Sequence, residues 1–231
     1  MMPMNEFGQP IGPAVSDWTR REHPSHRVIV GRYYSLDPLD VGAHAAGLWQ
    51  SLSPAGPSLW TYMGVGPFDR LEDFREYLSG IEESRDPLYF AVVDHLTRRA
   101  VGFLSLMRID RDNGVIEIGW VTFSPRMQRT RMSTEAHALL LSHVFDELHY
   151  RRCEWKCDSL NAPSQAAARR LGFEFEGVFS HAVVYKGRNR DTAWFSLTED
   201  RWPARKRAID AWLSPQNFDT LGLQKRPLGS Y

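Results

Sequence analysis

The stretch IEIGWVTFSPRMQRTRMS, residues 116–133, organises the rest of the chain. Its first part is β-branched and aromatic, which is typical of a strand, and that strand is predicted to end at Ser124 and Pro125. An arginine-rich turn then leads into a helix predicted to begin near Ser133 and Thr134. A strand that runs into a helix N-terminus presents unpaired backbone N–H groups and the positive end of the helix dipole. The stretch therefore predicts a phosphate-binding site.

Composition excludes several classes of protein. The chain has 231 residues with 28 basic and 28 acidic side chains, so a general nucleic-acid coat is not expected. Its two cysteines, Cys153 and Cys157, make no disulfide framework, and no His or Cys cluster predicts a metal site, so we interpret them as reduced core thiols. We find neither a signal-peptide pattern nor an apolar run of 18 residues. These features predict a cytoplasmic protein without membrane or nucleic-acid partners.

The first half of the chain reads as an arm, a strand and two helices. Residues 1–25 are polar and rich in Pro and Gly, which predicts an irregular arm, although Trp18 suggests that part of it packs back on the body. A strand is predicted at 27–36 and helices at 39–52, with Asp37 as a cap, and at 69–83. The loop 53–68 between the helices is unusually apolar, so it either lines a pocket or covers the core.

The second half predicts the sheet. Asn113 and Gly114 form a hairpin turn inside an antiparallel meander, and a strand–helix–strand unit follows that pairs in parallel. The expected elements are strands 88–94, 100–109 and 115–123, helix 134–148, strand 151–158, helix 161–171, strands 173–181 and 191–198, and a tail helix around 204–213. We therefore predict an α+β fold whose mixed, mostly antiparallel sheet of about seven strands has one parallel pair and helices on its faces. The predicted domain spans 26–200, with a helical tail at 201–231.

Three stretches in this order resemble the GNAT superfamily of acyl-CoA-dependent N-acetyltransferases, specifically its RimJ/RimL-like branch. SPRMQRTRMSTEA, residues 124–136, is similar to the Q/R-x-x-G-x-G/A pyrophosphate loop, with Gln128 in the first position. NAPSQAAARRLGF, residues 161–173, resembles the N-x-x-S helix of that branch. YKGRNRDTAWFSLTEDRW, residues 185–202, resembles its closing hairpin. The resemblance covers about 88–200 and implies a GNAT-type fold.

The resemblance implies acetyl-CoA as cosubstrate. Arg131 and Ser133 occupy the two small positions of the phosphate loop, where glycine normally allows close backbone approach. The helix N-terminus would still supply N–H donors, and the guanidinium groups of Arg126, Arg129 and Arg131 could contact phosphate directly. The implied coenzyme-binding residues are Val121, Phe123, Gln128, Arg129, Thr130, Arg131, Met132, Ser133, Thr134, Asn161 and Ser164.

Two residues are predicted to carry the chemistry. Glu117, on the strand before the loop, is the leading general base because some superfamily members keep a glutamate there, and His181 is the alternative. Ala168 stands where many relatives place a tyrosine acid, so the resemblance assigns the leaving thiolate to Ser164. The competing interpretation is that Ser164 only caps its helix. Predicted substrate-binding residues are Trp60, Tyr62, Glu117, Tyr185 and Asp191, with no metal.

The predicted function is transfer of an acetyl group from acetyl-CoA to a primary amine, either a protein N-terminus or a small amine. The alternatives are a non-catalytic acyl-CoA-binding or protein-interaction module on the same fold, and transfer of a larger acyl group such as succinyl. A homodimer is possible through Trp202 and Trp212 of the tail.

Overall fold

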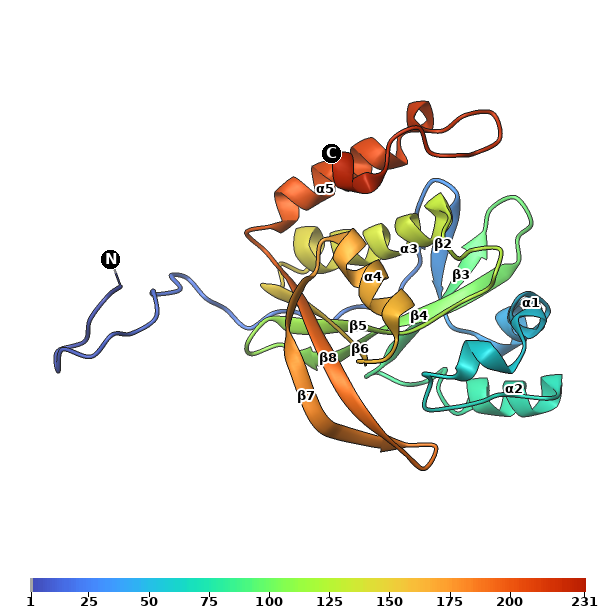
Figure 1. Cartoon of the computed structure of the whole chain (residues 1–231), viewed down its shortest axis with the longest axis horizontal. Coiled ribbons are helices and arrows are strands. Elements are labelled where there is room, and N and C mark those ends of the chain that lie inside the picture. The colour runs from blue at the N-terminus through green and yellow to red at the C-terminus, as the bar shows by residue number, and fades with distance from the viewer. Residues whose placement is uncertain (1) are drawn as a thin grey trace.

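The computed structural model describes residues 2–231 and contains one sheet of eight strands in the order β1-β2-β3-β4-β5-β6-β8-β7 (Figure 1). Only β5 and β6 pair in parallel. The strands are β1 Ile29–Val30, β2 Tyr34–Pro38, β3 Leu88–Asp94, β4 Ala100–Asp110, β5 Val115–Phe123, β6 Arg152–Asp158, β7 Glu174–Tyr185 and β8 Arg188–Thr198. The α-helices are α1 Val41–Leu52, α2 Leu71–Ser79, α3 Arg131–Ser142, α4 Ala162–Leu171 and α5 Trp202–Leu213. The predicted mixed α+β fold is confirmed.

The sheet has one strand more than predicted because the segment 27–36 is broken by a turn. The N–H of Gly31 donates to the carbonyl of Tyr34 at 2.8 Å, which folds β1 back on β2. A Cβ on Gly31 would lie 2.8 Å from that carbonyl and from the side chain of Leu139, so only glycine fits this close approach.

Several predicted boundaries were wrong. The cap of α1 is Asp40, whose carboxylate accepts the N–H of Ala43, and not Asp37. The helix α3 begins at Arg131, three residues before the predicted start at Thr134, because Thr130 caps it. A π-turn, His143–Glu147, ends that helical segment. The last two strands run on until only Lys186 and Gly187 separate them, whereas the strands predicted at 173–181 and 191–198 left residues 182–190 between them.

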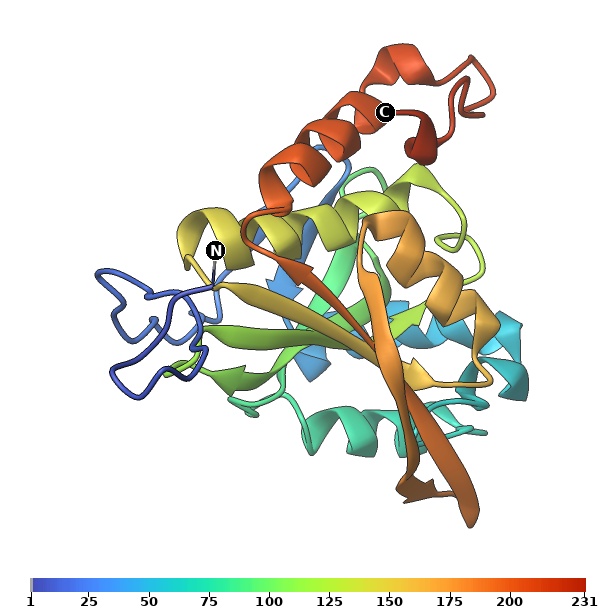
Figure 2. The same ribbon diagram turned by 60° about the vertical axis from the view of Figure 1, so that its left-hand side comes forward.

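The two faces of the sheet are covered differently (Figures 1 and 2). On one face, α3 and α4 pack over the main core, which includes Ile116, Ile118 and Trp155. On the other, α1 and α2 cover a smaller cluster that includes Tyr89 and Phe103 of β3 and β4. Within residues 2–231 no helix covers the second face of β6 and β8, where the charged site described below is found (Figures 1 and 2).

The C-terminal helix packs on the domain, and the N-terminal arm contacts it through residues that include Trp18. Trp202 of α5 stacks on Phe145 with ring centroids 5.4 Å apart and donates to Asp146, and Trp212 is buried as well. These tryptophans are therefore used within the chain and do not offer the dimer contact predicted for them. In the arm, the indole of Trp18 donates to the carbonyl of Asp112. None of the helices within 2–231 has the length and apolar character needed to cross a membrane.

Candidate active site

The parallel strands β5 and β6 separate in the middle of the sheet. They pair at only three positions, the last joining Glu117 to Glu154, although β5 continues to Phe123 and β6 to Asp158. The helix α3 follows β5 and α4 follows β6, so both helix N-termini lie where the strands have separated. A bulge with positive φ at Trp120 interrupts the β4–β5 ladder at the same level. This arrangement concentrates unpaired backbone groups at one end of the parallel pair.

The turn from β5 into α3 is held by its own side chains. Thr130 accepts the N–H of Met132 and donates to the carbonyl of Met127. Gln128 donates its side-chain amide to the carbonyl of Phe123 at 2.8 Å. The left-handed residue of the turn is Arg129, with φ of 59°. Residues 131 and 133 are helical, so the arginine and serine that replace glycine there put no φ strain on the backbone.

The arginines near this turn are not equivalent. The guanidinium of Arg131 packs 4.4 Å from the ring of Tyr33 and 5.2 Å from that of Phe218 in the tail. Arg126 and Arg129 are exposed. The structure therefore leaves Arg126, Arg129 and the first-turn N–H groups of α3 other than that of Met132 as the donors for an anion, with Arg131 packed on aromatic rings.

At the start of α4, Asn161 is the cap and Ser164 is not. The side chain of Asn161 accepts the N–H of Ser164 at 3.1 Å. The hydroxyl oxygen of Ser164 accepts instead from the indole N–H of Trp155, at 3.0 Å, so its own hydrogen is directed to another acceptor, here the sulfur of Cys157. Next to it, burial raises the pKa of the Cys157 thiol, partly offset by hydrogen bonding to Ser164.

Glu117 is a buried carboxylate with two cations beside it. Its side chain is 6% exposed, and Oε2 lies 3.0 Å from Nζ of Lys156 and 3.1 Å from Nε of Arg108. Burial raises the pKa of Glu117 above its usual value, and the two cations only partly offset that effect. A carboxyl group with a raised pKa holds a proton at a pH closer to neutrality, as a general base must.

Lys156 and Trp120 belong to this neighbourhood and were missed from the sequence. Lys156 is two residues beyond Glu154 on β6, so it shares that residue's face of the sheet. Trp120 is aimed by the bulge of β5 towards Tyr89, with ring centroids 6.2 Å apart. The alternation along 153–158 could have revealed Lys156, had the register of the parallel pair been known.

Three contacts join the loops on the helix-free side, which is the face of β6 and β8 that no helix of residues 2–231 covers. Tyr62 donates its hydroxyl to the carbonyl of Leu160, and Lys186 donates to the carbonyl of Trp60. Tyr185 donates to the buried carboxylate of Asp158 at 2.8 Å. These contacts bring the loop 53–68, the tip of the β7–β8 hairpin and the turn before α4 together.

The structure places the remaining predicted side chains in supporting positions. The ring of Trp60 is buried against Phe68 and Phe74, so it belongs to the core, and only Tyr62 of the predicted pair is partly exposed. Asp191 accepts the N–H of His181, which has positive φ, and thereby holds a bulge in β7. The His181 ring itself is exposed.

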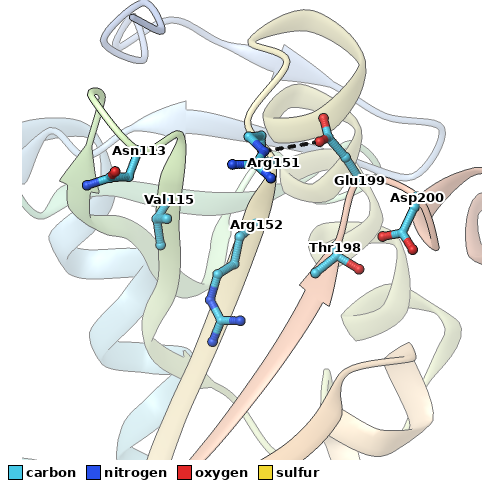
Figure 3. A pocket seen from close by; sticks show the side chains of 7 residues that line it. All are labelled: Asn113, Val115, Arg151, Arg152, Thr198, Glu199 and Asp200. Atoms are coloured by element: carbon cyan, nitrogen blue, oxygen red, sulfur yellow. Dashed lines mark hydrogen bonds and ion pairs between the residues drawn. The ribbon is translucent and has the colours of Figure 1, made fainter. Parts of the chain in front are cut away.

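A hollow lies at the opposite end of the parallel pair, away from Glu117 (Figure 3). Its arginines are already engaged, because Arg151 pairs with Glu199 at 3.3 Å and Arg152 pairs with Glu154 and Glu176. It is lined by Asn113, Val115, Arg151, Arg152, Thr198, Glu199 and Asp200. Within residues 2–231 no group of three possible metal ligands is found. The separated end of the strands is therefore the stronger candidate for chemistry.

Comparison with known proteins identifies the family. Residues 36–174 match the model of the acetyltransferase (GNAT) domain. A GCN5-related N-acetyltransferase from Brucella melitensis is 43% identical, with a TM-score of 0.92 over 94% of this chain and 98% of that one. A probable acetyltransferase of the GNAT family from Chromobacterium violaceum is 41% identical, with a TM-score of 0.78 over 84% and 97% of the two chains.

A curated relative gives the same result. The uncharacterized N-acetyltransferase p20 of Bacillus licheniformis is 27% identical over 144 residues, which are 61% of this chain and 80% of the relative. The family model covers more than half of the chain, from β2 to the start of β7. The chain therefore belongs to the GNAT family and is an acetyl-CoA-dependent acetyltransferase.

Proposed function

We propose that this enzyme is an N-acetyltransferase of the RimJ/RimL-like kind, that its acceptor is a primary amine, and that Glu117 is the general base. The acceptor would be a protein N-terminus or a small amine. The observation that carries the proposal is the burial of an ionisable carboxylate where β5 and β6 separate, on the face without a covering helix. A buried carboxylate in such a position is expected to have a catalytic use because its burial is costly.

The donors at the strand–helix turn fit the pyrophosphate of acetyl-CoA. The first turn of α3 supplies backbone N–H groups and the positive end of a helix dipole, and the exposed Arg126 and Arg129 add charge. Gln128 and Thr130 hold the turn in shape. Acetyl-CoA supplies the acetyl group in activated form as a thioester. In this proposal the backbone N–H of Val121 polarises the thioester carbonyl.

Two side chains would move protons. Glu117 accepts a proton from the acceptor ammonium, so that the neutral amine can attack the thioester carbonyl. Ser164 donates a hydrogen bond to the departing thiolate, because its oxygen accepts from the indole N–H of Trp155 and its hydrogen can turn from Cys157 to the thiolate. The thiolate takes up the second proton that the acceptor nitrogen loses as the amide forms. The N-terminus of α4 supports negative charge there.

The acceptor would approach from the helix-free side, next to Glu117. Tyr62 and Trp120 are partly exposed there, and Tyr185 lies at the tip of the adjoining hairpin. Apolar and aromatic walls of this kind favour an acceptor with a bulky or partly apolar group beside its amine.

The test is acceptor-dependent release of free thiol from acetyl-CoA across a panel of small amines and N-terminal peptides. Glu117→Gln is expected to lower kcat about 100-fold or more at pH 7, because general-base assistance contributes roughly that factor. The matched control is Glu199→Gln, which changes an exposed glutamate at the far end of the sheet and is expected to leave kcat unchanged (Figure 3). Equal rates in the Glu117 variant and wild type would reject this base.

Two further measurements test the coenzyme and the transferred acyl group. Saturating acetyl-CoA is expected to raise the melting temperature, as any ligand of the native state must. Replacing acetyl-CoA by succinyl-CoA tests the larger-acyl alternative, and faster turnover with succinyl-CoA would support that alternative. If acetyl-CoA binds but no acceptor in the panel causes thiol release, the proposed amine acceptor is contradicted.

A further inference from the structure

Lys156 is a buried cation next to the proposed base. Its side chain is 7% exposed, and its ammonium lies 3.0 Å from Oε2 of Glu117 and 2.7 Å from Oε2 of Glu154. It also lies 3.8 Å from the centroid of the Trp194 ring on β8. A buried lysine is unfavourable unless its charge is compensated, and here two carboxylates and an aromatic face compensate it.

The strand register makes this cation necessary. Glu117 and Glu154 are direct partners in the last pair of the parallel β5–β6 ladder, so their two carboxylates face the same side of the sheet. Two carboxylates that share a poorly solvated site cannot both ionise easily, and one of them takes up a proton. Lys156 contacts both, which allows both to remain charged.

We propose that Lys156 is a positioning residue that keeps the carboxylate of Glu117 ionised and fixed in its observed place, ready to accept a proton. This inference rests on the proposed role of Glu117 as base. In this role Lys156 does not contact either substrate. It acts through the carboxylate that it contacts.

Two other cations lie near the charged cluster of Glu117, Glu154 and Lys156, and both are less suited to this role. Arg108 of β4 also approaches Glu117, but its side chain is 61% exposed, so solvent screens its charge. Arg152 is directed to Glu154 and to Glu176 of β7, and Ser196 of β8 donates to Glu176 as well. Lys156 is therefore the buried cation that faces Glu117.

The experiment compares pH–rate profiles of Lys156→Met and Lys156→Arg with that of the wild type. Methionine keeps the volume of the side chain without the charge, so the acidic limb of kcat/KM is expected to move to higher pH by about one unit or more. On that limb the rate falls by up to about 10-fold for a shift of one unit, and it recovers in alkaline solution. Arginine keeps the charge and is expected to restore most of the rate at pH 7.

Arg108→Met is the matched control, with a smaller shift of the acidic limb because Arg108 is exposed. If Lys156→Met does not fold, as judged by circular dichroism, Lys156→Gln replaces it. A loss by the same factor at every pH would show a merely structural role and overturn the inference.

A direct titration separates this inference from the proposed function. The ¹³C signal of the Glu117 carboxyl group is followed against pH in wild type and Lys156→Met, and assigned with Glu117→Gln. An unchanged midpoint overturns the role of Lys156 whatever the activity shows. A shifted midpoint together with full activity of Glu117→Gln supports the coupling but rejects Glu117 as the base.

Discussion

The two faces of β6 are almost equally buried and yet chemically opposite. Cys153 and Trp155 point into the core under α3 and α4, whereas Glu154 and Lys156 point to the face that no helix covers. On the first face, burial of apolar surface stabilises the fold directly. On the second, each buried charge must be compensated by another charge, which contributes little net stability. Stability and chemistry are therefore divided between alternate residues of one strand.

The neighbouring strand β8 continues the contrast. Phe195 is fully buried and its ring lies 5.4 Å from that of Phe175, on the side of α4. Trp194, the residue before it, lies under the ammonium of Lys156 on the opposite face. Consecutive residues of one strand thus support the core and the site in turn.

The largest effect on stability is expected on the apolar face. Phe195→Ala should lower the free energy of unfolding by about 4 kcal/mol, because it removes a large buried side chain and leaves a cavity. Urea denaturation measures the loss. The folded fraction of the variant is expected to keep the wild-type kcat, since Phe195 does not contact the charged cluster.

Phe195→Leu is the milder companion if the alanine variant is too unstable to purify. A fall in kcat in folded Phe195→Leu, with little loss of stability, would break the proposed division between the faces.

A second test uses His137, a histidine buried in the apolar face. His137 of α3 lies between Phe123 and Trp155, with ring centroids 5.3 and 5.2 Å away, and burial lowers its pKa to about 4. The unfolded chain therefore binds a proton that the folded chain does not. Stability is full above the unfolded pKa near 6.5 and is lost as the pH falls from there towards 4.

The expected size of this loss is about 2 kcal/mol between pH 7.5 and pH 5. Urea denaturation at the two pH values measures it. The dependence should shrink in His137→Gln and persist in His23→Gln, which changes an exposed histidine of the arm. The same slope in all three proteins would show that another group causes it.

The parts of the fold that were predicted correctly depend on local chemistry. Asn113 and Gly114 form the hairpin turn between β4 and β5, and Gly172 ends α4 with φ of 96°, as its sequence position indicated. The start of α3 was missed because Thr130 was not recognised as its cap. The last hairpin was predicted too short because the bulge at His181 interrupts the alternation on which the strand prediction depends.

Individual residues of the candidate site could be predicted from the sequence, but the contacts between them could not. Glu117 was identified from its place before the turn, but its contact with Lys156 depends on where the parallel strands pair, and no local pattern encodes that register. The burial of the Trp60 ring likewise depends on the packing of α2 beneath it. Long-range register and packing are therefore what the sequence pattern left undetermined.

The smallest predicted effect concerns Ser164, which contacts Trp155 on the apolar face of β6. Ser164→Ala should lower kcat about 10-fold, because a hydrogen bond to a developing charge is worth roughly 1.5 kcal/mol. It should also lower stability, since the buried indole N–H of Trp155 loses its acceptor. Trp155→Phe removes that donor, so the double variant is expected to regain stability relative to Ser164→Ala without regaining kcat. Recovery of kcat together with stability would mean that Ser164 only supports Trp155 and takes no part in the reaction.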